Sequence, residues 1–127
     1  MTNTASILVL LFLAVTFIQS GYDKITDWNG NVSWLKGHFS QTPLKNQVPA
    51  ALLMVLVLEV FAGIFSLVGI IQLLVNGERT FGFYGAVLSA VTLILLLLGQ
   101  RLAKDYDGAR TIAIYFIPAV LAVYWLN

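Results

Sequence analysis

Glu59 is the residue of this sequence best placed to do chemistry. It is the only charged residue between Val48 and Val75, a run that is otherwise almost entirely apolar. A carboxylate inside such a segment is costly if it is ionised and unpaired, so it should face other protein groups. Two interpretations follow: Glu59 lines a functional polar pocket, or it makes a structural hydrogen bond that fixes the register of neighbouring helices.

Small and polar residues at helical spacing accompany Glu59. One set follows it in the same segment, and a second set repeats in the next apolar segment; the two sets are Ala62, Gly63, Ser66, Gly69 and Gly82, Gly85, Ser89, Thr92. Such faces favour close helix packing in lipid, which is the simpler interpretation. The functional interpretation is a buried ligand-binding pocket formed by Glu59, Gln19, Ser66, Tyr115 and Lys24.

Other familiar chemistry is missing from the sequence. The chain has no cysteine, so it cannot form disulfides, cysteine zinc sites or iron–sulfur clusters by itself. His38 is the only histidine, which excludes bis-histidine haem ligation by one chain, and Asp27 is the only carboxylate near it in sequence. No phosphate-binding glycine loop is present. We therefore expect no metal site, and no catalytic residue can be assigned.

The composition indicates a membrane protein. Hydrophobic residues make up 59% of the 127 residues and charged residues only 10%, with a mean hydropathy of +0.87. Soluble domains carry about 25% charged residues, because they must cover their surface with polar groups. A lipid-facing surface removes that requirement. The net charge of +1 provides no basic field for nucleic acid.

Four apolar segments must position the candidate residues. They lie at about residues 6–25, 48–75, 81–99 and 110–126. Because about 20 helical residues cross a hydrocarbon core of ~30 Å, each can span a bilayer when its polar ends are included. The expected fold is all-α, an integral membrane four-helix bundle in a single domain, residues 1–127. The first five residues contain no Lys or Arg, which favours a retained helix over a cleavable signal peptide.

The connections also carry information. The first, Tyr22 to Gln47, is the longest and mixes tryptophan with polar residues. It is either an interfacial segment at the headgroup level or an ordinary surface loop. Asn29-Gly30 predicts a turn within it, and Asn76-Gly77 predicts a tight turn between the second and third spans.

The basic residues are distributed unequally among the connections. Six of the seven lie in the first and third connections, and Arg79 alone lies in the second. The positive-inside rule then places connections one and three in the cytoplasm and both termini outside.

Short motifs in the first two spans resemble a known family. The first span ends in FIQSGYDKI, which holds Gly21 and Lys24 in a G-x-x-K pattern, and the second contains LEVFAGIFSLVG, which holds Glu59, Gly63 and Gly69. In this order, followed by a short Glu-Arg-Thr turn, the motifs resemble the DoxX family of small four-helix bacterial membrane proteins. The resemblance covers nearly the whole chain.

The resemblance implies a role beside redox enzymes. The family is named after a membrane subunit of a thiosulfate:quinone oxidoreductase, and other members are linked to redox or oxidative-stress complexes. It implies a membrane or accessory subunit of a redox or respiratory complex in the bacterial inner (cytoplasmic) membrane. Its partners would be the lipid bilayer and other membrane subunits, and those subunits would carry the electron carriers. A quinone-like molecule or lipid headgroup would lie near Glu59, and any enzyme activity would belong to the whole complex.

Two other functional classes stay open at this point. One is a structural or assembly component of a membrane complex with no ligand, suggested by the small-residue faces and the missing chemistry. The other is a small-molecule transporter, which would need a water-accessible path past Glu59, Ser66 and Ser89. The absence of cysteine argues against a role that depends on a thiol of this chain.

Overall fold

The computed structural model describes residues 3–127, and its regular structure in that range is entirely helical. Four of its helices are long and apolar enough to cross a membrane, which confirms the predicted all-α fold with four candidate spans. A fifth, shorter helix occupies part of the first connection. The helices are α1 (Thr4–Thr26), α2 (Trp28–His38), α3 (Val48–Val75), α4 (Thr80–Leu102) and α5 (Tyr106–Leu126).

The long helices extend past their apolar residues into polar ends. The shortest, α5, has 21 residues, which at ~1.5 Å per residue gives about 32 Å, enough to cross a hydrocarbon core. It begins at Tyr106 because the side chain of Asp105 accepts a hydrogen bond from the Gly108 backbone N–H at 2.9 Å. This satisfies one of the free amide groups at the start of the helix.

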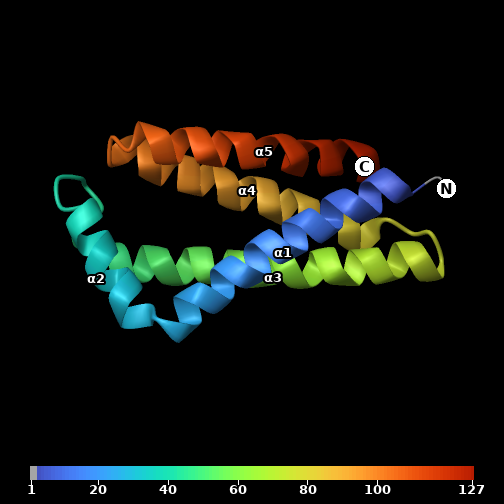
Figure 1. Ribbon diagram of the computed structural model, residues 1–127, viewed down its shortest axis with the longest axis horizontal. Helices are drawn as coiled ribbons and strands as arrows, with labels where there is room; N and C mark the ends of the chain where they lie inside the picture. The colour runs from blue at the N-terminus through green and yellow to red at the C-terminus, as the bar shows by residue number, and fades with distance from the viewer. Residues whose placement is uncertain (1–2) are drawn as a thin grey trace.

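The four spans run alternately up and down. Figure 1 shows both termini and the α3–α4 connection at one end of the bundle, and α2 with the α4–α5 connection at the other. Helix α3 packs between α1 and α4, while α5 packs mainly on α4 and also touches α1. We call the end that contains α2 the α2 end.

Glycines let α3 and α4 approach closely. A Cβ on Gly69 would overlap the Cα of Gly82, and a Cβ on Gly85 would lie 2.7 Å from the backbone nitrogen of Ser66. Such contacts are closer than side chains tolerate, so these positions require glycine for the observed packing. Part of the small-residue faces predicted from sequence therefore forms the α3–α4 interface, whereas Gly63 faces Ile18 of α1.

The same contacts define the antiparallel register of the two helices. Residues 69 and 82 meet, and residues 66 and 85 meet. About one turn further along, Ala62 therefore comes level with Ser89, and about two turns further along, Glu59 comes level with Thr92. All four of these residues are buried, with at most 1% of their surface exposed. Both hydroxyls bond to their own helix: Ser89 donates to the Gly85 carbonyl and Thr92 to the Leu88 carbonyl. Glu59 therefore faces a dry, closely packed interface.

The first connection differs from its sequence-based prediction at one point. Asn29 and Gly30 lie inside α2, so the predicted turn there is wrong. The chain instead bends at Asp27, whose φ and ψ of −135° and 52° are not helical. Its carbonyl accepts hydrogen bonds from the backbone and side-chain nitrogens of Asn31, which starts a new helix at the bend.

The predicted turn at Asn76-Gly77 is confirmed. Gly77 has a positive φ of 74°, a conformation that glycine adopts without steric cost. The side-chain oxygen of Asn76 accepts a hydrogen bond of 3.0 Å from the backbone of Glu78, which closes the turn between α3 and α4.

Candidate functional site

An ion pair links α1 to α3 inside the bundle. Lys24 Nζ lies 2.8 Å from Glu59 Oε1, and the same ammonium group donates a 2.7 Å hydrogen bond to Ser20 Oγ. The angles of the contact with Glu59 fall outside hydrogen-bond geometry, so it is an ion pair by distance. The Glu59 side chain is 1% exposed and that of Lys24 is 17% exposed. The buried carboxylate therefore has a counter-charge, supplied from nearer the end of the bundle.

Helical spacing explains why Lys24 meets Glu59. Lys24 follows the buried residue Gly21 by three positions and thus continues the face of α1 that packs on α3. A close crossing of the two helices is made possible by Gly63, where a Cβ would lie 2.6 Å from Ile18 Cγ1. The two motifs that carry the family resemblance therefore meet in space.

The other residues predicted to line the site lie elsewhere. Gln19 is exposed on α1. Tyr115 is 36% exposed, and its ring packs against Phe12 at 6.0 Å between centroids. Within residues 3–127, no hydrogen bond or ion pair joins either side chain to Glu59. The structure thus brings Lys24 to Glu59 but does not bring Gln19 or Tyr115 there.

Ser66 is buried but is not a partner of Glu59. Its side chain is completely shielded from solvent, and its hydroxyl has no hydrogen-bond partner among the described residues. It packs against the backbone of Gly85, where the two helices are closest. Ser66 therefore belongs to the helix interface.

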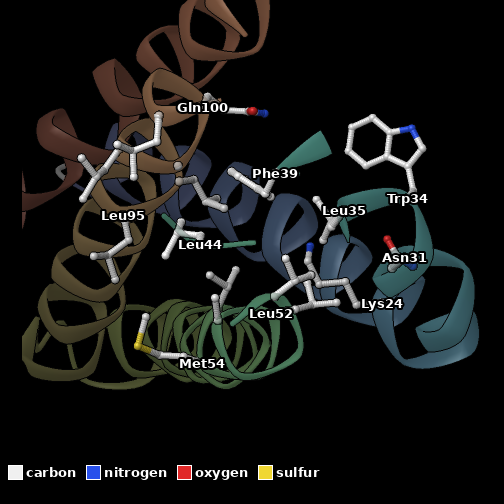
Figure 2. Close-up of a pocket in the computed structure, with 17 residues that line it drawn as sticks. Lys24, Asn31, Trp34, Leu35, Phe39, Leu44, Leu52, Met54, Leu95 and Gln100 are labelled. Atoms are coloured by element: carbon white, nitrogen blue, oxygen red, sulfur yellow. The ribbon is translucent and has the colours of Figure 1, made fainter. Parts of the chain in front are cut away.

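A cavity of about 390 Å³ lies beside Lys24 at the α2 end. This volume is within the range of small-molecule sites, ~300–1,000 Å³. Most of its walls are aliphatic side chains of α3 and α4, including Leu52 and Leu95, and α2 forms another wall. Figure 2 shows Lys24 and Asn31 near each other on one side and Gln100 apart from them. Glu59 does not line this cavity but lies behind Lys24.

Two polar side chains leave hydrogen-bonding capacity near the cavity. The Lys24 ammonium group has three protons and donates one of them to Ser20. Asn31 uses its amide nitrogen on the carbonyls of Asp23 and Asp27, which leaves its side-chain oxygen as an acceptor. The cavity can thus offer one donor and one acceptor to a ligand with a polar head and an apolar body.

A second polar group lies where α2, α4 and α5 meet. His38 Nε2 is 2.9 Å from Gln100 Oε1 and 3.7 Å from Asp105 Oδ2. Its ring also stacks on Trp34, with centroids 4.7 Å apart. No local pattern in the sequence indicates this group, because its members are far apart in the chain.

Comparison with known proteins identifies the family of the chain. The DoxX family matches residues 7–99, which include the Gly21–Lys24 segment, Glu59 and both small-residue faces. A search of curated proteins finds no match, and neither does a search of solved structures. Because the match covers most of the chain and the fold has four long apolar helices, this chain belongs to the DoxX family of multi-pass membrane proteins.

Proposed function

We propose that this chain is a membrane or accessory subunit of a redox or respiratory complex, and that its cavity holds the head of an amphipathic ligand. The ligand would be a quinone-like molecule or a lipid headgroup. The observation that carries the proposal is the cavity itself, where one half-buried, paired ammonium group stands at an otherwise mostly apolar wall. A few placed polar groups in an apolar pocket are typical of small-molecule sites.

Lys24 is the residue that we expect to bind the ligand's polar atom. A proton of the ammonium group that is not donated to Ser20 can be donated to a carbonyl or ester oxygen in the cavity. A hydrogen bond from a charged donor contributes about 1.5–3 kcal/mol to binding, which is more than a hydrogen bond from a neutral donor contributes. The apolar walls of α3 and α4 would hold the rest of the molecule by excluding it from water.

Glu59 acts in this proposal through Lys24. A lysine near a helix end normally extends its ammonium group toward the headgroups. The carboxylate of Glu59, reached from inside the bundle, holds it in the cavity wall instead. Glu59 is thus a positioning residue, which agrees with its burial and with its position outside the cavity lining.

The orientation predicted from the basic residues would place the cavity in the cytoplasmic half of a bacterial inner membrane. The first and third connections both lie at the α2 end, so the positive-inside rule assigns that end to the cytoplasm. Trp34 is 63% exposed there, as expected of an indole at the headgroup level. We therefore propose that α2 lies in the interface and that the ligand enters from the cytoplasmic leaflet.

Any electron transfer would depend on partner chains. The sequence has no cysteine, and no cluster of three or more His, Asp or Glu side chains suited to a metal occurs within residues 3–127. In our proposal the chain binds and orients a ligand, and an associated oxidoreductase subunit exchanges electrons with it.

One observation favours the alternative of a structural component without a ligand. The α3–α4 interface around Glu59 is sealed, with Ser66, Ser89 and Thr92 fully buried. This packing also counts against the transporter hypothesis, which needs a water path past Ser66 and Ser89. The structural alternative explains the interface, but it gives no reason for the cavity beside Lys24.

Ligand retention in a matched pair of variants tests the proposal. The double variant Lys24→Met/Glu59→Leu removes the donor and its buried counter-charge together, so it should still fold. The control, Lys36→Met, removes an exposed lysine of α2 that does not line the cavity. Each protein would be extracted mildly from native membranes, and its bound lipids, quinones and proteins identified by native mass spectrometry.

The proposal predicts a specific pattern in this experiment. Wild type and the Lys36→Met control retain one amphipathic molecule, and the double variant loses it by about tenfold or more, as expected for loss of a charged hydrogen bond. A wild-type chain that carries partner subunits but no small molecule would support the structural alternative. Equal retention by the double variant would show that Lys24 does not bind the ligand.

A further inference from the structure

His38 does not line the cavity, yet it contacts three residues that do. Its ring stacks on Trp34, meets Phe39 edge-on at 5.0 Å between centroids, and bonds to Gln100. All three are lining residues of the cavity. We propose that His38 is the positioning residue of this wall, which holds α2 against the junction of α4 and α5. This inference rests on the proposed function only in that the wall would cover a bound ligand.

The polar contacts at this junction favour one tautomer of His38. Two acceptor oxygens face Nε2, one from the Gln100 carboxamide and one from the Asp105 carboxylate. This arrangement favours a proton on Nε2, which then donates to Gln100 Oε1. The carboxamide nitrogen of Gln100 is then turned toward Gly108, where a Cβ would lie only 2.7 Å from it. Gly108 thus leaves room for the oriented amide.

Asp105 connects the same junction to the start of α5. Its Oδ1 caps α5 by accepting the backbone proton of Gly108, while Oδ2 faces His38. The neighbouring charged groups are engaged elsewhere, because Arg101 lies over the ring of Tyr106 and Arg110 pairs with Asp107. The His38 ring is therefore held by Gln100 and Asp105.

Helix α2 lies against α3 and α1, and Asn31 bonds to the Asp23 carbonyl of α1. No residue of α2 is fully buried, so this packing is shallow. The hydrogen bond from His38 to Gln100 is the one side-chain hydrogen bond between α2 and α4 in the described part of the chain. Without it, Trp34 would lose its stacking partner, and Phe39 would be free to leave Gly99, which its Cζ atom covers.

Single cysteines can report on the wall directly, because the chain contains none. A Cβ at Gly99 would lie 3.6 Å from Phe39 Cζ, so Gly99→Cys would sit under the wall. At Gly37 nothing lies within 4 Å of a Cβ, so Gly37→Cys is an uncovered control on the same helix. Maleimide labelling rates would be measured in nanodiscs, each in the wild-type, His38→Leu and His38→Gln backgrounds.

His38→Leu should raise the labelling rate at position 99 by about fivefold, the factor expected when one ordinary hydrogen bond is lost. The rate at position 37 should stay the same. His38→Gln, which retains a side-chain N–H donor, should restore slow labelling at position 99. An unchanged rate at position 99 in His38→Leu would overturn the inference, as would equal acceleration at both positions.

A ligand measurement separates this inference from the proposed function. Binding of a decyl-tailed benzoquinone to the cysteine-free chain in nanodiscs would be compared between wild type, His38→Leu and His38→Gln, with empty nanodiscs as the control. We expect weaker binding in His38→Leu and recovery in His38→Gln. No binding by wild type would contradict the quinone-like form of the proposed function, while the labelling result would still decide the role of His38. Binding by wild type with equal affinity in His38→Leu would overturn the positioning role.

Discussion

Removing Lys24 alone should lower the free energy of unfolding by more than removing Glu59 alone. Lys24→Met leaves a carboxylate whose side chain is 1% exposed without a counter-charge. Loss of one partner of a buried pair typically costs about 3–5 kcal/mol. Glu59→Leu instead leaves Lys24, which is more exposed and lies in the last turn of α1. Its ammonium group can extend to the headgroups, so we expect a cost of only about 1–2 kcal/mol.

The double variant makes this reasoning quantitative. Lys24→Met/Glu59→Leu replaces the pair by apolar side chains, a change that is often neutral or stabilising inside proteins. We expect its free energy of unfolding to lie within about 1 kcal/mol of the wild-type value. This implies a coupling energy of roughly 3 kcal/mol or more between the two positions.

Reversible unfolding in bicelles gives the required free energies. Denaturing detergent would be titrated into the four proteins, and helix content and tryptophan fluorescence followed together. The reasoning is refuted if Lys24→Met costs no more than Glu59→Leu. It is also refuted if the two single costs add up in the double variant, because additivity would mean that the residues do not interact.

Three further predictions concern packing, the cavity and orientation. Gly69→Ala should destabilise the bundle by about 1–3 kcal/mol, because its Cβ would overlap the backbone of α4. Gly37→Ala is the control and should not destabilise it, since nothing lies within 4 Å of a Cβ there. Unfolding titrations compare the two variants. Ala51→Phe should fill part of the cavity and reduce benzoquinone binding in nanodiscs, and unchanged binding would place the ligand elsewhere. In intact cells, an impermeant maleimide should label Gly77→Cys but not Lys45→Cys if the α2 end is cytoplasmic, and the reverse pattern would invert the proposed orientation.

The sequence was sufficient to predict the spans, because the backbone in lipid must satisfy its own hydrogen bonds and long apolar runs therefore form helices. It was not sufficient for α2, a helix of 11 residues with no buried side chain. Asn29 and Gly30 favour a turn when they stand alone. In the structure the chain bends at Asp27 instead, just before α2. The side chain of Asn31 then donates a hydrogen bond to the Asp27 carbonyl.

The candidate site was only partly predictable. Lys24 and Glu59 were both named, but their contact depends on the crossing of α1 and α3, which hydropathy does not reveal. A usable signal was present: Leu10, Ala14 and Gly21 are buried on the face of α1 that Lys24 continues. Gln19 lies outside that run and is exposed. The junction of His38 with Gln100 had no local signal, because 62 residues separate them.

Photo-crosslinking in native membranes can show whether an amphipathic ligand binds in the cavity beside Lys24. A tailed benzoquinone with a photoreactive head would be activated in native membranes, and the modified peptides sequenced. We expect crosslinks that concentrate on lining residues of three helices, such as Trp34, Leu52 and Leu98, and that excess unmodified benzoquinone suppresses. Crosslinks that resist competition, or that fall mainly on exposed residues of α5 such as Ile117, would contradict this expectation.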